Sequence, residues 1–336
     1  MKSLKNQLYI IGGSGFLGSS LTKSLSRSDY NFFVCDLVKN DYLDKNNHLY
    51  KNIDIEKPDT LKDFLPGSVI INLAAVHRDD VRPLTRYDDV NVRGSVNVCE
   101  AARKNGVNKI IFTSSVAIYG FAPADTNELG EPKYFNEYGR TKYLAEQVYR
   151  KWYAEDPDNR TLVIIRPTVI FGEGNRGNTY NLLRQIASGA FAMFGNGKNK
   201  KSMAYVENVA AFIEHSLTFK SGLHIYNYID KPDFDMNTLV SKVRQTLFRK
   251  NNVGLRLPAF LGMIIGHFAD FVSKVSGKNL PVSSIRVKKF MSTTQFATSL
   301  SETGFVPPVS LEEGLVRTLR YEFLEDNSDK QIFETE

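Results

Sequence analysis

The glycine loop at residues 12–18 constrains this chain more than any other feature of its sequence. An apolar run that ends Ile10-Ile11 leads into Gly12-Gly13-Ser14-Gly15-Phe16-Leu17-Gly18, and a helix-period segment follows at once. Gly12 permits a tight turn, Gly15 lets the backbone approach a phosphate, and Gly18 lets helix and strand pack closely. The free N–H groups at the start of that helix then face an anionic ligand. Together these elements predict a dinucleotide-binding βαβ unit.

Short apolar runs alternate with helix-period segments through the first half of the chain. This order is typical of a parallel sheet with crossover helices. The predicted strands are Leu8–Ile11, Phe32–Cys35, Val69–Ala75, Ile110–Thr113 and Leu162–Ile165, and the predicted helices are Phe16–Ser26, Asp89–Asn105 and Tyr138–Tyr153. We therefore expect an α/β fold with a Rossmann-type, doubly wound parallel sheet.

The alternation weakens beyond Gly172, and no Pro/Gly/Ser-rich linker divides the halves. The predicted elements there are helices at Thr179–Ser188, Val206–Thr218, Met236–Phe248 and Leu311–Phe323, with a strand near His224–Tyr228. We expect residues 1–172 to form the cofactor-binding domain and residues 173–325 a smaller substrate-binding lobe interleaved with it. Residues 326–336 are expected to be a polar, frayed tail.

Composition narrows the functional classes. A chain of 336 residues can form one large domain and a smaller one, and its net charge of +6 comes from basic residues spread along most of its length. That spread argues against a nucleic-acid partner. Cys35 and Cys99 lack metal-ligand spacing, as do the five histidines, so we expect no metal site and no disulfide framework. The absence of a signal peptide fits the same expectation of a reducing cytoplasm.

An acidic residue follows the second predicted strand. Asp36 lies about 20 positions past the glycine loop, where a carboxylate can accept both hydrogen bonds from an adenosine ribose. This favours NAD over NADP, because the carboxylate repels a 2′-phosphate. The alternative is that Asp36 only caps a turn. Asp54 and Ile55 follow a further expected strand, which precedes Val69–Ala75, and these two residues are expected to flank the adenine.

Tyr138 and Lys142 form a Y-x-x-x-K pair on one face of a predicted helix. The pair follows a strand that ends Thr113-Ser114-Ser115, so hydroxyl, phenol and ammonium groups can meet at the carboxyl ends of the strands. Removing hydride from a carbinol carbon requires a base for the hydroxyl proton, and free tyrosine has a pKa of about 10. A nearby ammonium lowers that pKa toward the working range. The alternative is an ordinary surface pair.

These residues together resemble the extended short-chain dehydrogenase/reductase family, which contains nucleotide-sugar epimerases and dehydratases. The resemblance covers nearly the whole chain, and its further markers are Asn72, Tyr119-Gly120 and Arg166-Pro167. It implies a catalytic set of Tyr138 and Lys142 with Ser114 or Ser115 on the reacting oxygen. It also implies NAD as cofactor, bound by Gly12, Gly15, Phe16, Leu17, Gly18, Asp36, Asp54, Ile55, Leu73, Ala74, Ala75, Asn91, Thr113, Tyr138, Lys142 and Pro167.

Departures from the family pattern narrow the reaction. The 4,6-dehydratases of this family place an Asp-Glu pair after the catalytic hydroxyl residue, where this chain has Val116 and Ala117. The fucose synthases place a cysteine there, and residues 115–118 contain none. The remaining reactions are 4-epimerisation and 4-ketoreduction. A scaffold that binds NAD without catalysis is a third reading, and the intact Ser/Tyr/Lys set argues against it.

Four further stretches resemble a subgroup of O-antigen lipopolysaccharide biosynthesis that interconverts GlcNAc and GalNAc on undecaprenyl diphosphate. They are His77–Val81, Phe171–Asn178, Lys201–Val206 and Arg286–Phe290. Family members that bind UDP usually carry an Arg-x-x-Asp in the C-terminal lobe, where this chain has a basic cluster around Arg286. The expected ligands of the substrate diphosphate are Arg176, Asn178, Lys201 and Arg286. A soluble UDP-GlcNAc or UDP-hexose 4-epimerase and a nucleotide-sugar 4-ketoreductase remain the alternatives.

The segment 257–276 is apolar and has basic flanks. Leu257–Ala269 contains no Asp, Glu, Lys or Arg, yet it is shorter than the about 20 apolar residues that span a bilayer. Such a segment fits a helix that lies in the interface of an anionic leaflet, which predicts a peripheral protein on the cytoplasmic face of the inner membrane. A buried helix or a subunit contact is the alternative. The resemblance also implies a homodimer built on the helices 89–105 and 138–153.

Overall fold

Seven parallel strands form the central sheet of the computed structural model, which describes residues 7–40, 49–78, 80–276, 284–327 and 329–333. The strand order is β10-β6-β5-β4-β1-β2-β3, and each neighbouring pair is parallel. Their bounds are β1 Leu8–Ile11, β2 Phe32–Asp36, β3 Tyr50–Asn52, β4 Val69–Asn72, β5 Lys109–Thr113, β6 Thr161–Pro167 and β10 Gly222–Tyr228. The predicted α/β fold with a doubly wound parallel sheet is confirmed.

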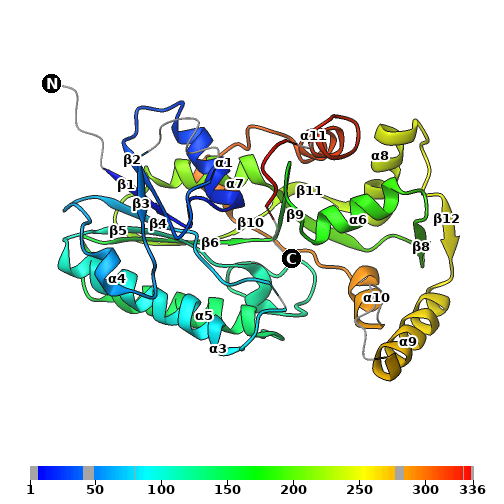
Figure 1. Ribbon diagram of the computed structural model, residues 1–336, viewed down its shortest axis with the longest axis horizontal. Helices are drawn as coiled ribbons and strands as arrows, with labels where there is room; N and C mark the ends of the chain where they lie inside the picture. Colours follow the sequence, from blue (N-terminus) through cyan, green and yellow to red (C-terminus); the bar gives the residue numbers. More distant parts are fainter. Residues whose placement is uncertain (1–6, 41–48, 79, 277–283, 328, 334–336) are drawn as a thin grey trace.

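Helices cover both faces of this sheet (Figure 1). The helices α1 (Phe16–Leu25) and α7 (Val206–Ser216) lie on one face, and α4 (Gly94–Lys104) and α5 (Glu137–Ala154) lie on the other. Strand side chains alternate between the two cores: Ile10 packs with α1 and α7, and Ile11 packs with α4. The order reverses between β1 and β4, which creates the crevice where such sheets bind ligands.

The short elements around the sheet position several site residues. They are η1 (Pro58–Leu61), α3 (Thr85–Tyr87), the π-helical turn η2 (Asp88–Arg93), η3 (Val116–Tyr119) and η4 (Leu300–Thr303). The predicted strand Val69–Ala75 is too long, because β4 ends at Asn72. Residues 73–75 remain partly buried without extending the strand, so their apolar character reports burial and not sheet pairing.

The second lobe has its own core and two small sheets. One sheet has the order β11-β9-β7 and the other pairs β12 with β8. The elements of this lobe are β7 (Val169–Phe171), α6 (Asn178–Ala187), β8 (Ala192–Phe194), β9 (Lys200–Tyr205), β11 (Asp230–Asp235), α8 (Met236–Phe248), β12 (Leu255–Leu257), α9 (Ala259–Ser276), α10 (Ser284–Met291) and α11 (Leu311–Phe323). Between these elements the chain returns to the central sheet through α7 and β10.

The described part of the C-terminal tail pairs with the rest of the protein, and the expectation that it frays is wrong there. The N–H of Phe333 donates to the carbonyl of Gly174 at 2.8 Å, and the N–H of Arg176 donates to the carbonyl of Phe333 at 2.8 Å. The Phe333 ring lies 5.6 Å from that of Phe16 at the start of α1. The red end of the ribbon in Figure 1 therefore returns to the middle of the molecule. A polar composition did not reveal this pairing because backbone groups and one aromatic ring make it.

The apolar segment forms α9 at the end of the molecule farthest from β1–β3 (Figure 1). Its small residues Gly262, Gly266 and Ala269 are buried, and α10 packs against this helix. Several large apolar side chains are exposed instead, and four of them are more than half exposed: Phe260 (61%), Ile264 (58%), Phe268 (67%) and Phe271 (64%). We call these four residues the α9 stripe. Among the helices of the described ranges, none has the length and apolar character that crossing a membrane requires.

Candidate functional site

The glycine loop joins β1 to α1 at the crevice of the sheet. Gly12 has a φ of 77°, and a Cβ there would lie 2.6 Å from the backbone nitrogen of Ala74. A Cβ on Gly18 would lie 2.5 Å from the carbonyl oxygen of Gly12, so both positions require glycine for the fold itself. Gly15 differs, because it is exposed and a Cβ there would meet only the Gly12 oxygen, at 3.3 Å. Space for the close approach of a ligand remains at Gly15.

Ser14 gives a second sign that this loop fits a pyrophosphate. Its hydroxyl oxygen is buried and has no hydrogen-bond partner within the described residues. Gly15, the N-cap of α1, provides no side-chain cap, and the first turn of α1 carries no acidic residue. Unmade hydrogen bonds at a buried hydroxyl cost stability, and the start of a helix favours anions. The loop residues therefore fit the phosphates of a dinucleotide.

Asp36 ends β2 beside this loop. Its carboxylate accepts the N–H of Ser14 at 2.9 Å and that of Leu37 at 2.7 Å. Burial raises the pKa of Asp36, and these backbone hydrogen bonds lower it. Each carboxylate oxygen can accept a further hydrogen bond, so the residue can both hold the turn and receive a ribose hydroxyl. The two readings of Asp36 from the sequence are therefore compatible.

Asn40 also organises the loop, and no sequence signal pointed to it. Its buried side-chain amide donates to the Ser14 carbonyl and to the Ser19 hydroxyl, both at 2.9 Å. Asp54 lies near the end of β3, where its carboxylate accepts the N–H of Glu56 at 3.0 Å and pairs with Lys57 at 3.0 Å. Asp54 thus shapes the turn after β3. Ile55 is buried against Gly94.

The segment after β4 is held by two asparagines. The N–H of Ala74 donates to the side chain of Asn72 at 3.1 Å. Asn91 on η2 accepts the N–H of Val76 at 2.8 Å and donates to its carbonyl at 2.9 Å. Its amide also donates to Thr141 of α5 at 2.9 Å. Asn91 thereby links residues 73–76, which face the crevice, to the helix that carries Tyr138 and Lys142.

Three predicted catalytic groups meet between β5, η3 and α5. Ser115 is the N-cap of η3, and Tyr138 lies in the first turn of α5. Burial raises the pKa of Tyr138 to about 12, and a hydrogen bond with the Ser115 side chain acts in the lowering direction. The Ser114 hydroxyl is buried and has no hydrogen-bond partner among the described residues. An unsatisfied hydroxyl on the residue before Ser115 fits a site that receives a polar substrate group.

Gly139 is a further residue that the sequence did not single out. A Cβ at this position would lie 2.5 Å from the carbonyl oxygen of Ala117 in η3. Its N–H donates to the side chain of Asn136, the N-cap of α5, at 2.9 Å. Only glycine lets α5 approach η3 so closely, and this approach brings Tyr138 to Ser115.

Lys142 is buried one turn after Tyr138. Its ammonium lies 4.3 Å from the centre of the Phe112 ring on β5. Burial lowers the pKa of Lys142 to about 7, and the charge of Glu146 acts in the opposite direction. Two effects therefore oppose each other at Tyr138 and Lys142. Burial favours the neutral phenol and the neutral amine, whereas the Ser115 side chain favours the phenolate and the charge of Glu146 favours the ammonium. Such perturbed pairs are typical of acid–base sites.

The remaining predicted cofactor residues border the same crevice. Thr113 is buried at the end of β5 and donates to the Asn72 carbonyl at 3.3 Å. Pro167 is the last residue of β6. Phe16 and Leu17 start α1, where both side chains pack against the core of the second lobe.

Three of the four predicted diphosphate ligands have described side chains, and these belong to different elements or segments. Arg176 forms an ion pair with buried Glu322, and its guanidinium lies 4.1 Å from the Tyr180 ring centre. Asn178 is exposed at the start of α6. Lys201 on β9 donates to the Ser292 carbonyl at 2.6 Å, and burial lowers its pKa to about 8. Arg286 belongs to α10, but its side chain lies outside what the structure describes. The structure therefore gives Arg176 and Lys201 protein partners without joining them in one cluster.

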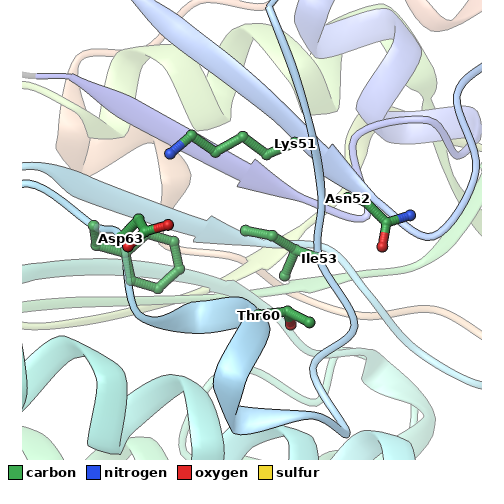
Figure 2. A pocket seen from close by; sticks show the side chains of 6 residues that line it. Lys51, Asn52, Ile53, Thr60 and Asp63 are labelled. Atoms are coloured by element: carbon green, nitrogen blue, oxygen red, sulfur yellow. The ribbon is translucent and has the colours of Figure 1, made fainter.

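A cavity of about 330 Å³ lies elsewhere, at the β3 edge of the sheet (Figure 2). It is lined by Lys51, Asn52, Ile53, Thr60, Asp63 and Phe64. These residues come from β3, η1 and the segments beside them, and none belongs to the set around Tyr138. We therefore assign this cavity no part in catalysis.

Comparisons with known proteins agree with this arrangement. The model of the NAD dependent epimerase/dehydratase family matches residues 8–228. The N-acetyl-α-D-glucosaminyl-diphospho-ditrans,octacis-undecaprenol 4-epimerase of Escherichia coli O157:H7 is 48% identical over 99% of this chain and 100% of its own length. A UDP-glucose 4-epimerase of Vibrio cholerae is 26% identical over 97% of this chain and 98% of its own length.

A solved structure supports the fold. The UDP-glucose 4-epimerase of Thermotoga maritima, crystallised with UDP-glucose, superposes with a TM-score of 0.72. It is 22% identical in sequence, and the match covers 94% of this chain and 98% of that one.

Proposed function

We propose that this chain, which belongs to the NAD dependent epimerase/dehydratase family, is a 4-epimerase that interconverts GlcNAc and GalNAc on undecaprenyl diphosphate. One observation carries the proposal: the relative that is 48% identical over essentially the whole chain is an epimerase of that lipid-linked sugar. Epimerising carbon 4 of GlcNAc gives GalNAc. NAD is the cofactor of the family.

The residues of the site support this chemistry. NAD, when bound, supplies the hydride acceptor and donor for carbon 4. Tyr138 takes the proton of the 4-hydroxyl group, Ser114 or Ser115 holds the same oxygen, and Lys142 favours the phenolate by its charge. Val116 and Ala117 occupy the start of η3 directly after Ser115 and carry no acid–base group. The chain thus offers proton transfer at carbon 4 and no carboxylate at these positions for water elimination.

We further propose that the protein lies peripherally on an anionic membrane through the α9 stripe. The four side chains of this stripe are each more than half exposed. Lys274 in the last turn of α9 is exposed, as are Arg256 before it and Lys288 on α10. The acidic residue of α9, Asp270, faces α10, because its carboxylate accepts the N–H of Ser284 at 3.2 Å. Apolar and basic side chains are therefore exposed on and beside α9, a combination that suits the interface of an anionic leaflet.

The substrate class is tested by giving purified enzyme, without added cofactor, either GlcNAc-diphospho-undecaprenol in detergent or UDP-GlcNAc. We expect GalNAc to form from the lipid-linked sugar only. Conversion of UDP-GlcNAc alone would contradict the lipid-linked substrate and support a soluble nucleotide-sugar 4-epimerase. If the enzyme converts neither substrate but oxidises NADH when a 4-keto nucleotide sugar is added, the alternative 4-ketoreductase function replaces the epimerase.

Asp36 is proposed to receive the adenosine ribose of NAD in addition to holding the turn. Replacing it with alanine (Asp36→Ala) removes a charged acceptor, so we expect NAD affinity to fall about 10-fold or more. NADP affinity should fall less or rise, because the repulsion of its 2′-phosphate also disappears. Binding of both cofactors to cofactor-stripped protein measures this ratio. An equal loss of affinity for NAD and NADP would mean that Asp36 only holds the turn. The control is Asp59→Ala, which replaces an exposed aspartate.

A homodimer through α4 and α5 is proposed from the family resemblance. These helices pack on each other at the outside of the sheet, and Val96 of α4 is an exposed apolar residue there. Sedimentation velocity should then give about twice the chain mass of 38.0 kDa. A mass equal to one chain would refute the dimer.

A further inference from the structure

Glu146 lies on the face of α5 that carries Lys142, one helical turn further on. Residues four apart on a helix have neighbouring side chains. Glu146 is fully buried, and its two carboxylate oxygens accept hydrogen bonds from Arg166 of β6 at 2.9 and 2.7 Å. A bidentate pair of this kind fixes the plane of the carboxylate. The negative charge beside Lys142 therefore has a defined position.

Arg166 is itself held by two further residues outside α5. Its guanidinium donates to the Tyr119 hydroxyl of η3 at 2.6 Å and to the carbonyl of Glu128 at 3.0 Å. The Tyr119 hydroxyl donates to the Asn227 side chain of β10 at 2.9 Å. The network thus runs from the catalytic helix through β6 and η3 to the edge strand of the central sheet. Every member is hydrogen-bonded, so the carboxylate of Glu146 cannot swing away without breaking several buried bonds.

The charged form of Lys142 needs such a partner. The side chain is buried, and its ammonium lies over the apolar ring of Phe112. The titratable groups around the Lys142–Glu146 pair are Arg166 on β6, Tyr119 on η3, and Tyr138 and Tyr149 on α5, with Cys99 of α4 beside Tyr149. Glu146 is the carboxylate in this set. Burial alone would favour a neutral amine, which could not assist the phenolate of Tyr138.

We propose that Glu146 is a positioning residue for catalysis, whose carboxylate, fixed by Arg166, keeps Lys142 in its ammonium form beside Tyr138. The inference rests on the proposed acid–base role of the Tyr138–Lys142 pair. Glu146 touches neither substrate nor cofactor and acts only through Lys142. The pair of residues Glu146 and Arg166 then has a catalytic consequence in addition to joining α5 to β6.

The first test uses the protein without ligand, so it does not depend on the substrate. Lysine side chains labelled with ¹³C are titrated by NMR, and the signal missing from a Lys142→Met variant identifies Lys142. We expect a midpoint near pH 7 in the wild-type protein. In the Glu146→Gln variant it should lie about one pH unit lower, because an opposing charge has been removed. An unchanged midpoint would overturn the proposal.

Glu146→Gln leaves Arg166 without its charged partner and risks misfolding, so the double variant Glu146→Gln/Arg166→Gln is measured alongside. The two amide side chains can still hydrogen-bond to each other. In this double variant the Lys142 midpoint should again move to lower pH, but by a smaller amount. Tyr119→Phe perturbs the same network without changing a charge, and its Lys142 midpoint should match the wild type. A shift in Tyr119→Phe equal to that in Glu146→Gln would show a merely structural effect.

The second readout is the pH dependence of kcat on the substrate that the wild-type enzyme converts. The alkaline limb reports loss of the Lys142 ammonium, so it should move to lower pH in both glutamine variants. A uniform loss of kcat without movement of this limb would contradict the proposal. An inactive wild-type enzyme with a shifted NMR midpoint would instead contradict the proposed function and leave the electrostatic link in place.

Discussion

Replacing Tyr138 with phenylalanine (Tyr138→Phe) is expected to lower kcat about 10²- to 10⁴-fold, the range that a positioned proton acceptor contributes. The substitution removes one hydroxyl group and leaves the ring that α5 packs beside η3. Cofactor binding should persist, because the glycine loop and Asp36 are unchanged. Turnover is measured by analysing the released sugars for GalNAc, and bound NAD is measured after denaturing the protein.

Tyr153→Phe on the same helix is the matched control. Tyr153 lies 15 residues further on, about 22 Å along the helix axis, and packs against the core. Its kcat should equal that of the wild type. Unchanged turnover in Tyr138→Phe would remove the phenol from the mechanism, and a loss of NAD together with turnover would assign Tyr138 to cofactor binding alone.

Replacing the α9 stripe is expected to release the protein from membranes. The four residues are Phe260, Ile264, Phe268 and Phe271, which lie within about 80° of one another around the helix. Each side chain is more than half exposed, so moving it out of water contributes about 1 to 2 kcal/mol. Four of them give about 4 to 8 kcal/mol, and the partition coefficient should fall roughly 10³-fold or more when all four become serine.

Co-sedimentation with vesicles containing an anionic phospholipid measures this change. The control variant replaces Val306 and Leu65, two exposed apolar residues outside α9, with serine. It should bind vesicles as the wild type does. Equal binding by the stripe variant would refute membrane contact through α9, and a change in sedimentation mass of the stripe variant without lipid would assign the stripe to a subunit contact instead.

The stripe variant also separates membrane contact from catalysis. It should convert a GlcNAc-diphosphate carried on a short, water-soluble prenol at the wild-type rate, because α9 lies away from α5, the helix that contains Tyr138 (Figure 1). Its activity on the full lipid substrate in vesicles should fall with its binding. Equal losses on both substrates would place the effect in the folding of the second lobe.

Local sequence patterns predicted several elements of the fold well, in both halves of the chain. The predicted bounds of β1, α8 and α11 agree with the observed ones, because the apolar residues of each element follow the pattern of its strand or helix. The glycine loop and the Tyr138–Lys142 pair could also be recognised in the sequence, because each requires particular residue types at a fixed, short spacing along the chain. Patterns did not reveal the short strands β7, β8, β9, β11 and β12, which are paired across long stretches of chain.

The tertiary structure decided which distant residues meet. Gly139 and Ala117 are in contact because α5 packs on η3, and Glu146 pairs with Arg166 because α5 packs on β6. Neither pairing leaves a local sequence pattern. The same holds for the tail at Phe333, and for α9, whose composition was apolar in the sequence but whose exposed face depends on α10. The sequence alone determined the fold class and singled out Tyr138 and Lys142 as the proposed acid–base pair, because both depend on short-range spacing. Only the folded chain set the electrostatic environment of that pair, because burial and long-range ion pairs create it.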